Sequence, residues 1–597
     1  MSNINISDGY IRNPWMENWP EEVPRHIEYP NISLGEFFRE TAEKYPNSQA
    51  IWFEGWRCTY EELDRMIDQF ATGLTKMGVG RGDVVAIDLP NTPQFVIAFY
   101  AICRIGAIAN PIIPLNRFVE IVHQINDSKA KVLIILDSIY EEHLEGKDLT
   151  KMPSLTNIIL TGLAEYLSKI KGFLGKLLGK VPYMKEWPKE FENITFNEFQ
   201  AVLEEGSPIT LPDIEFNPKE DIAVLIYTGG TTGLPKGVKT SHYNLVVNAI
   251  QANEWSQNQL PELKDTLGTG GMFIVLPLAH SFALSIGMSI AVSNGYKMIL
   301  FPQPPTPISK MLKIIKKEGA TFGPGVPTLW NKITLDPKSE NYQGELASLV
   351  ACLSGASALP LEVKQKFESI TGSRIIEGYG MSETSPLLTA SPFHKYKENT
   401  VGFPVSDTYI KIVDPDKGEE ILPQCPHEDC SECGMEQTKY IGEICGSGPQ
   451  VMLGYLNRPD ATEYALREDD HGRTWYYTAD IGCIDKDGYL HIKDRKRDMI
   501  KYKGHSVFPR EVEDLIYMHP AVNEVGVVGV PDPESGETIK AYISLKKEYQ
   551  DQITEEEMKE WCKANISPYK YPRIIEIIPE LPKSVVGKIL RRELREE

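Results

Sequence analysis

The sequence is short of positive charge. Its 597 residues include 62 lysines and arginines against 83 aspartates and glutamates, which gives a formal net charge of −21. A protein that binds nucleic acid generally presents a basic face to the phosphates. The composition therefore argues against a nucleic-acid partner, although it says nothing about the fold.

Cysteine is also sparse, and the nine residues do not have the dense spacing of a disulfide scaffold. The beginning of the chain, MSNINISDGYIRNPWMENWP, is polar and acidic, unlike a secretory signal. We therefore expect a cytoplasmic protein with reduced thiols.

One hydrophobic stretch, residues 271–292 (GMFIVLPLAHSFALSIGMSIAV), is nearly free of charge and long enough to span a bilayer. However, Pro277 and His280 interrupt it after the strand-like MFIVL. We interpret the stretch as a buried strand, a turn and a buried helix rather than a membrane span.

The chain alternates short β-branched runs with helical patterns, which predicts an α/β fold. In residues 60–77, for example, apolar residues recur at helical spacing, and the strand-like DVVAIDL follows. A charged stretch, 491–509, precedes a separate α/β pattern. We place a hinge near residues 494–497, between a large α/β body (1–494) and a small C-terminal domain (495–597).

The loop YTGGTTGLPKG, residues 227–237, directly follows the apolar run 222–226. Its glycines let backbone N–H groups converge on an anion, its threonines add hydroxyl donors, and Lys236 adds a charge suited to phosphate. It is not a Walker A loop, because Pro235 precedes the lysine and Gly237 follows it. A mobile surface turn is the alternative for this loop taken alone.

Three further motifs carry groups suited to a nucleotide. In YGMSETSP, Glu383 offers a hard oxygen ligand for Mg²⁺ and Tyr379 a flat face for a base. In YYTADIG, Asp480 has two oxygens that could accept from both ribose hydroxyls. PKSVVGKILRREL presents Lys588 after a glycine. Each motif alone is compatible with solvated acids and a surface lysine.

Together, in this order, these motifs resemble those of the adenylate-forming superfamily, which contains acyl-CoA synthetases, beetle luciferases and peptide-synthetase adenylation domains. The resemblance runs from about Ser33 to Leu594 and is most specific in the loop at 227–237 and in PKSVVGK. It implies a body of several subdomains (1–494) and a small mobile α+β domain (495–597).

The resemblance implies a role for each matching position. Lys588 and His280 would act at the substrate carboxylate, and Thr228 and Glu383 would hold Mg²⁺. Asp480 and Arg495 would hold the ribose. The residues implied around the phosphates and the adenine are Thr228, Gly229, Gly230, Thr231, Thr232, Gly233, Lys236, Gly355, Ala356, Ser357, Glu377, Gly378, Tyr379, Gly380 and Ser382.

Three positions depart from the family pattern. Ser382 stands where threonine is usual, which preserves the hydroxyl. Ala479 replaces the more usual glycine, with an effect that the sequence does not reveal. Arg497 falls at the hinge position, where aspartate or lysine is usual.

The alternative for His280 is a core histidine whose hydrogen bonds are all made within the protein.

The implied reaction has two steps. A carboxylate attacks the α-phosphorus of ATP and releases pyrophosphate, so that cations must offset two approaching anions. The thiol of coenzyme A then attacks the acyl adenylate. Rotation of the C-terminal domain would remove Lys588 between the steps.

The motifs are most similar to those of medium- and long-chain fatty acid–CoA ligases. Aromatic or short-chain acids, a separate acyl-carrier protein as acceptor, and a non-catalytic nucleotide sensor are the alternatives. Retention of Lys588 argues against the sensor. The expected partners are thus a carboxylic acid, ATP and coenzyme A, and a homodimer is a further alternative.

Residues 162–180 carry a leucine-rich stripe at helical spacing among Lys169, Lys171, Lys176 and Lys180. Such a basic amphipathic helix is typical of contact with a membrane surface, here the inner face. A helix packed on the core is the alternative.

The segment CPHEDCSECG, residues 425–434, lies between two strand-like runs where relatives are usually short. Cys425, His427, Cys430 and Cys433 could form a structural zinc site. A plain cysteine-containing loop and redox chemistry are the alternatives.

Overall fold

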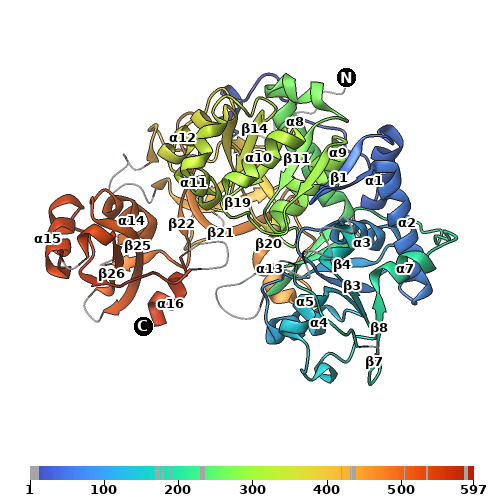
Figure 1. The fold of residues 1–597 in the computed structure, drawn as a ribbon. Coiled ribbons are helices and arrows are strands. Elements are labelled where there is room, and N and C mark those ends of the chain that lie inside the picture. Colours follow the sequence, from blue (N-terminus) through green and yellow to red (C-terminus); the bar gives the residue numbers. More distant parts are fainter. Residues whose placement is uncertain are drawn as a thin grey trace. The chain divides into compact units, whose positions relative to one another are not determined.

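The computed structural model describes residues 13–167, 175, 181–188, 190–228, 235–418, 420–430, 432, 439–502, 505–532, 535–550, 552–583 and 589–596. The chain forms two compact units (Figure 1). One unit, the body, comprises Trp19–Tyr409 and Ser447–Thr474. The other, the hinge unit, comprises Met1–Asn18, Ile410–Gly446 and Trp475–Glu597.

The body contains a nine-stranded sheet in the order β17-β16-β15-β14-β13-β11-β12-β1-β2. Its middle strands, from β1 to β15, are parallel, whereas β2, β16 and β17 are antiparallel to their neighbours. The strands are β17 Phe403–Pro404, β16 Leu387–Ala390, β15 Arg374–Gly380, β14 Ala351–Ser354, β13 Phe322–Gly325, β11 Gly271–Ile274, β12 Lys297–Leu300, β1 Gln49–Phe53 and β2 Trp56–Thr59.

The second sheet of the body has eight strands in the order β10-β9-β4-β3-β5-β6-β8-β7. Only the outermost strands, β10 and β7, are antiparallel to their neighbours. The strands are β10 Lys236–Ser241, β9 Ile222–Thr228, β4 Ile108–Pro111, β3 Val84–Asp88, β5 Val132–Leu136, β6 Asn157–Thr161, β8 Ile194–Glu198 and β7 Glu190–Phe191.

Helices cover the two sheets and bury their apolar faces (Figure 1). One core cluster unites the nine-stranded sheet with α10, α11 and α12, and another unites the eight-stranded sheet with α4 and α5. The helices of the body are α1 Leu34–Lys44, α2 Tyr60–Lys76, α3 Pro93–Arg104, α4 Phe118–Ser128, α5 Asp137–His143, α7 Phe199–Glu205, α8 His242–Gln259, α9 Ile290–Ser293, α10 Ser309–Glu318, α11 Pro327–Leu335, α12 Leu361–Thr371 and α13 Pro459–Ala465.

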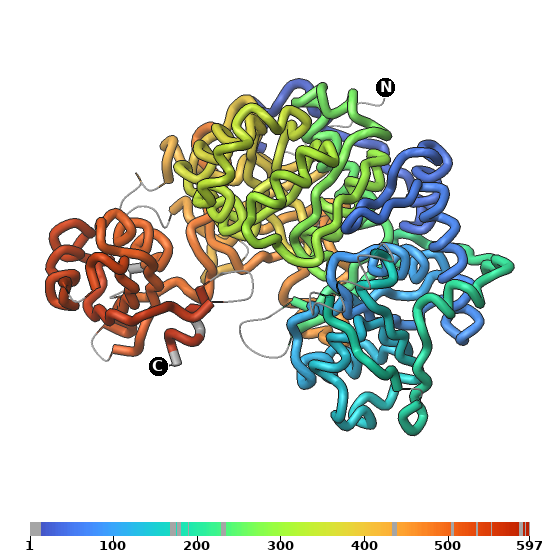
Figure 2. The backbone as a smooth tube through the Cα atoms, viewed as in Figure 1, coloured from blue at the N-terminus to red at the C-terminus, as the bar shows by residue number. Residues whose placement is uncertain are grey.

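The hinge unit, which contains the end of the chain in red (Figure 2), is also α/β. In one sheet β18, β19 and β21 are adjacent and β22 pairs with β21; in the other the order is β24-β23-β26-β25, with β27 on β26. The elements are β18 Tyr409–Val413, β19 Gly442–Ser447, β21 Thr474–Ile484, β22 Leu490–Arg495, β23 Ile500–Tyr502, β24 His505–Val507, α14 Pro509–Tyr517, β25 Val522–Asp532, β26 Gly536–Leu545, α15 Glu555–Asn565, β27 Ile574–Ile577 and α16 Arg591–Glu596.

The predicted α/β fold is confirmed, as are the helix at 60–77 (α2) and the strand after it (β3). Thr59 and Glu62 form a reciprocal capping box that fixes the start of α2. The predicted domain boundary between 494 and 495 lies inside the hinge unit and stays a prediction.

The apolar stretch 271–292 forms the buried strand β11, a turn and a buried helix, as predicted. The helix differs from expectation in one respect, because residues Ala283–Ser289 are π-helical before α9 begins. No helix among the described residues has the length and apolar character that a membrane crossing requires.

Candidate active site

The predicted phosphate loop connects two antiparallel strands of the body. Thr228 is the last residue of β9, Lys236 is the first of β10, and the two are register partners. The backbone pairing therefore holds the threonine hydroxyl and the lysine ammonium at the same end of the hairpin. Gly229, Gly230, Thr231, Thr232 and Gly233 lie outside the described residues.

Tyr455 connects the hairpin to the predicted magnesium ligand. Its hydroxyl donates to Glu383 Oε1 at 2.8 Å, and Lys236 Nζ lies 4.3 Å from the centre of its ring. The backbone supports this arrangement, since Leu456 N donates to Gly237 O and Met452 N donates to Glu383 O. The structure thus brings both residues to one tyrosine side chain, with Glu383 at its hydroxyl and Lys236 over its ring.

His280 lies on the turn between β11 and the π-helical segment, next to Ser281. The Ser281 hydroxyl lies 3.1 Å from that of Ser382, which directly precedes Glu383. The turn that carries the histidine is therefore bonded to the segment that carries the predicted magnesium ligand.

The imidazole of His280 is accessible to solvent, but desolvation by the surrounding protein lowers its pKa. Its Nδ1 accepts a hydrogen bond from Phe282 N at 3.2 Å. A neutral ring with an accepting Nδ1 carries its proton on Nε2. His280 is thus prepared to donate from Nε2 to an oxygen.

The predicted adenine segment follows β14. Gly355 is buried, and a Cβ there would lie 3.1 Å from the Phe282 ring and 3.6 Å from Gly378 O. Ala356 has a φ of 70°, and both Ala356 and Ser357 are exposed. The segment therefore brings Gly355 against Gly378 and presents the next two residues to solvent.

Strand β15 carries four of the predicted residues. Glu377 is fully engaged by protein, because its carboxylate accepts from Leu359 N and from the Tyr396 hydroxyl, each at 2.9 Å. A Cβ at Gly380 would lie 1.7 Å from Pro386 O, so only glycine fits there. Tyr379 is buried. These positions shape the end of the strand, and a nucleotide role for Glu377 stays a prediction.

In the hinge unit, Asp480 and Arg495 are register partners on β21 and β22, and Arg495 Nε lies 2.7 Å from Asp480 Oδ1. Asp480 is buried, whereas Arg495 is partly exposed. The two predicted ribose residues therefore form one ion pair.

Ala479, the residue before Asp480, has a φ of 57°, in the left-handed region that favours glycine. Its N–H donates to Glu443 Oε1, and its carbonyl accepts from Lys496 N. These bonds hold the backbone in a conformation that costs alanine free energy, which explains why glycine is the usual residue in the family.

Lys588 lies outside the described residues. The flanking residues Lys583 and Ile589 form an antiparallel bridge. Three residues after Lys588, Arg591 pairs with Asp494 at 2.8 Å and with Glu513 at 2.6 Å. The segment after the predicted catalytic lysine is therefore fastened to Asp494, a residue of the predicted hinge.

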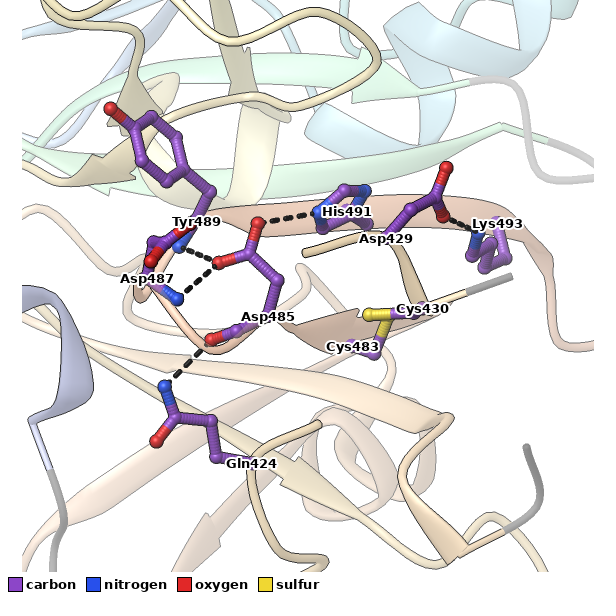
Figure 3. Close-up of a disulfide and its surroundings, with 9 residues drawn as sticks. All are labelled: Gln424, Asp429, Cys430, Cys483, Asp485, Asp487, Tyr489, His491 and Lys493. Atoms are coloured by element: carbon purple, nitrogen blue, oxygen red, sulfur yellow. Dashed lines mark hydrogen bonds and ion pairs between the residues drawn. A yellow bond between two sulfur atoms is a disulfide. The ribbon is translucent and has the colours of Figure 1, made fainter. Parts of the chain in front are cut away.

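The cysteine segment differs from our prediction. Cys430 is disulfide-bonded to Cys483 of β21, so our expectation of reduced thiols is wrong for this pair (Figure 3). His427 is half-exposed and lies 3.6 Å from Glu432, and Cys433 lies outside the described residues. Across the described ranges, no group of three or more histidine, cysteine or acidic side chains is arranged to hold a metal.

Three hydrogen bonds, two of them between backbone groups, explain why Cys430 pairs with Cys483. Cys425 N donates to Ile484 O, and Lys486 N donates to His427 O. Gln424 Nε2 donates to Asp485 O (Figure 3). The segment thus lies along the end of β21, where it meets Cys483. A separation of 53 residues conceals this neighbour in the sequence.

Tyr455 is the functional candidate that sequence reasoning missed. It is one of 27 tyrosines, and no local pattern sets it apart from the others. Its importance follows only from its contacts with Glu383 and Lys236, residues 72 and 219 positions away.

Two family models match the chain. The model described as "AMP-binding enzyme" matches residues 38–456, and the model described as "AMP-binding enzyme C-terminal domain" matches residues 511–588.

Named relatives match over nearly the whole chain. A long-chain-fatty-acid–CoA ligase of Bacillus subtilis (strain 168) is 36% identical over 585 residues, and one of Escherichia coli O157:H7 is 35% identical over 590 residues. In both comparisons 98% of each chain is covered.

Among solved structures, the anthranilate CoA ligase AuaEII in complex with anthranoyl-AMP superposes with a TM-score of 0.76 at 26% identity, covering 96% of this chain and 98% of that one. The chain therefore belongs to the AMP-binding, adenylate-forming enzymes, among the AMP-forming acid–thiol ligases.

Proposed function

We propose that the protein activates a medium- or long-chain fatty acid with ATP to an acyl adenylate and transfers the acyl group to coenzyme A. The observation that carries this proposal is the set Lys236–Tyr455–Glu383. The contact between Ser382 and Ser281 joins this set to the turn that carries His280. The set and the turn together provide a cation, a hard oxygen ligand and a neutral imidazole donor on connected segments of the body.

In this proposal each group has one task. Lys236 and the loop before it bind the β- and γ-phosphates, and His280 Nε2 donates to the carboxylate of the acid. Mg²⁺ held by Thr228 and Glu383, both hard oxygen donors, would offset phosphate charge. Lys588 would stabilise the charge that develops at the α-phosphate.

The fatty acid is favoured by the relatives that are about 35% identical, which are named long-chain-fatty-acid–CoA ligases. An aromatic acid is the alternative favoured by the likeness to the anthranilate ligase at 26% identity. Transfer to a separate carrier protein would need the same first step.

A panel of acids of increasing chain length, with aromatic acids included, tests the substrate. AMP and thioester formation are measured with and without coenzyme A. We expect acid-dependent AMP release that is greatest with medium or long chains. Greater activity with aromatic or short-chain acids would refute the proposed substrate class.

Lys588→Ala tests whether Lys588 acts in adenylate formation but not in thioester formation. We expect loss of acid-dependent ATP–pyrophosphate exchange, while thioester formation from supplied acyl adenylate continues. Lys583→Ala is the matched control, because Lys583 lies in the same segment but pairs with Glu524 at 2.7 Å. Normal exchange by Lys588→Ala would contradict the assignment.

We also propose that residues 162–180 contact an anionic membrane surface, which would give access to acids that partition into lipid. Lys169, Lys171, Lys176 and Lys180 lie outside the described residues, so the support comes from the sequence pattern alone. Sedimentation with anionic vesicles should weaken when the four lysines are replaced by glutamine, and equal binding would count against the contact.

A further inference from the structure

Helix α4 is bonded to the segments on both sides of the phosphate loop. His123 Nε2 donates to Pro235 O at 2.9 Å, and Pro235 directly precedes Lys236. One turn later, Asp127 Oδ2 accepts from the Tyr227 hydroxyl at 2.9 Å, and Tyr227 directly precedes Thr228. The two bonds thus flank the loop, one on each side of it.

Asp127 also holds the segment that follows Tyr455. Its backbone carbonyl accepts from Asn457 Nδ2 at 2.8 Å, and Arg458 Nη1 lies 3.7 Å from Asp127 Oδ1. The same helical turn therefore contacts the neighbours of Thr228, Lys236 and Tyr455. These three residues come from separate segments of the chain.

Helix α4 is itself firmly placed. The buried side chain of Gln124 donates to Asn110 Oδ1 and to Pro111 O, both at the end of β4. Ser128, the last residue of the helix, accepts from Asn110 Nδ2 at 2.9 Å. Because β4 is an inner strand of the eight-stranded sheet, these bonds fix the helix, and with it the two ends of the loop, relative to the sheet.

The side chain of Asp127 is only 10% exposed, and desolvation together with this carboxylate raises the pKa of Tyr227. The phenol is therefore a neutral donor. The ring of His123 also packs edge-on against the ring of Tyr227, with centroids 6.2 Å apart. The two bonds form one connected cluster.

We propose that His123 and Asp127 are positioning residues for the nucleotide: they fix the two ends of the phosphate loop and so determine its affinity for the triphosphate of ATP. This inference rests on the proposed function, and it adds two residues on a helix outside every motif that the sequence singled out. Neither residue is required to touch ATP.

The test uses the full-length protein. His123→Phe keeps the ring and removes the donor, His123→Gln restores an N–H donor, and Tyr227→Phe removes the bond to Asp127. Asn126→Ala is the matched control, because this residue of the same helix donates to Lys151 O, outside the site. Circular dichroism and thermal melting identify variants that fail to fold.

Loss of one such hydrogen bond corresponds to about a threefold to tenfold change in affinity. We expect the KM for ATP in pyrophosphate exchange to rise by this factor in His123→Phe and Tyr227→Phe. We expect recovery in His123→Gln and little change in Asn126→Ala. Thioester formation from supplied acyl adenylate should stay at the wild-type rate in every variant.

Two results would overturn the inference: an unchanged KM for ATP in both folded variants, or equal losses in the two half-reactions, which would indicate a merely structural role. Direct ATP binding by calorimetry, without any acid, separates this inference from the proposed function. If wild type binds ATP but activates no acid, the proposed function fails, and the ATP affinities of the variants still decide the role of helix α4.

Discussion

Two regions of the molecule, one in each compact unit, contain predicted site residues and their partners, and different interactions hold them. The phosphate region consists of Thr228, Lys236, Glu383 and Tyr455. Strand pairing holds Thr228 beside Lys236, while the Tyr455 hydroxyl binds Glu383 and the Tyr455 ring lies against Lys236. In the hinge region (Asp480, Asp494, Arg495 and Arg591), ion pairs between side chains hold the residues.

The difference has a physical consequence. The Tyr455 hydroxyl is a neutral donor to the Glu383 carboxylate, and a hydrogen bond to a charged group contributes about 1.5–3 kcal/mol to stability. Loss of one member of a buried ion pair leaves an uncompensated charge. We therefore expect the hinge region to respond to substitution more strongly than the phosphate region.

The largest effect is expected for Arg591→Ala. Only 18% of the Arg591 side chain is exposed, and the substitution leaves the buried Asp494 and Glu513 carboxylates without their cation. Breaking such a pair costs about 3–5 kcal/mol. In the phosphate region, Tyr455→Phe removes one hydrogen bond to the Glu383 carboxylate and should cost about 1.5–3 kcal/mol. Denaturant unfolding measures both variants, and equal losses would contradict the comparison.

The disulfide adds a covalent connection to the hinge unit. Because it closes a loop with a sequence separation of 53, Cys430→Ser should lower the free energy of unfolding by about 2–4 kcal/mol. A reducing agent should have the same effect on the wild type and none on the variant.

Metal analysis of wild type and Cys430→Ser tests whether the cysteine segment binds zinc. Zinc in reduced wild-type protein that is absent from Cys430→Ser would show that the segment binds metal as predicted from the sequence. Protein without zinc, together with a Cys430–Cys483 cross-linked peptide, would establish the disulfide instead.

The body contains a buried acid, Asp88, whose surroundings differ from those of the acids that pair with Arg591 in the hinge unit. Asp88, at the end of β3, is fully buried, and within the described part of the chain neither carboxylate oxygen has a hydrogen-bond partner. Burial raises its pKa well above the ordinary value. The folded protein therefore retains a proton that the unfolded chain loses near pH 4.

The raised pKa of Asp88 makes the folded protein less stable as the pH rises. Above about pH 4 the folded state binds one proton more than the unfolded state, so stability falls by about 1.4 kcal/mol per pH unit up to the folded pKa. Asp88→Asn removes the titrating carboxyl group, so its free energy of unfolding should lack this pH dependence. The stability of the variant relative to wild type should thus rise with pH over this range, and parallel stability curves would refute the prediction.

The smallest effect concerns Ala479. Replacement by glycine relieves the positive φ but adds chain entropy to the unfolded state, so we expect a net gain of about 0.5–1 kcal/mol. Ala201→Gly in helix α7 is the matched control and should instead lose about 1 kcal/mol. A loss of stability in both variants would contradict the strain at Ala479.

Much of the fold and part of the site could be predicted from the sequence. Helix α2 and strand β11 were predictable because hydrophobic periodicity is a local property. Thr228 and Lys236 could be assigned to one loop because the glycines and threonines between them are contiguous. The assignment of Asp480 and Arg495 to the ribose came only from the family resemblance, and their ion pair was not predicted.

Contacts between distant segments could not be predicted. Tyr455 meets Glu383, and His123 meets Pro235, only after sheets and helices have packed. The same holds for Cys430, for which the sequence suggested the neighbouring His427 and Cys433 as partners. Hydrogen bonds to the end of β21 and to the turn after it bring the segment to Cys483 instead.

The sequence by itself determined which chemical groups are present and which local elements carry them, because propensity and spacing act over a few residues. The tertiary structure alone decided which of these groups are neighbours. Packing of the sheets fixes distances between residues that the chain separates by tens or hundreds of positions, and no local pattern encodes those distances.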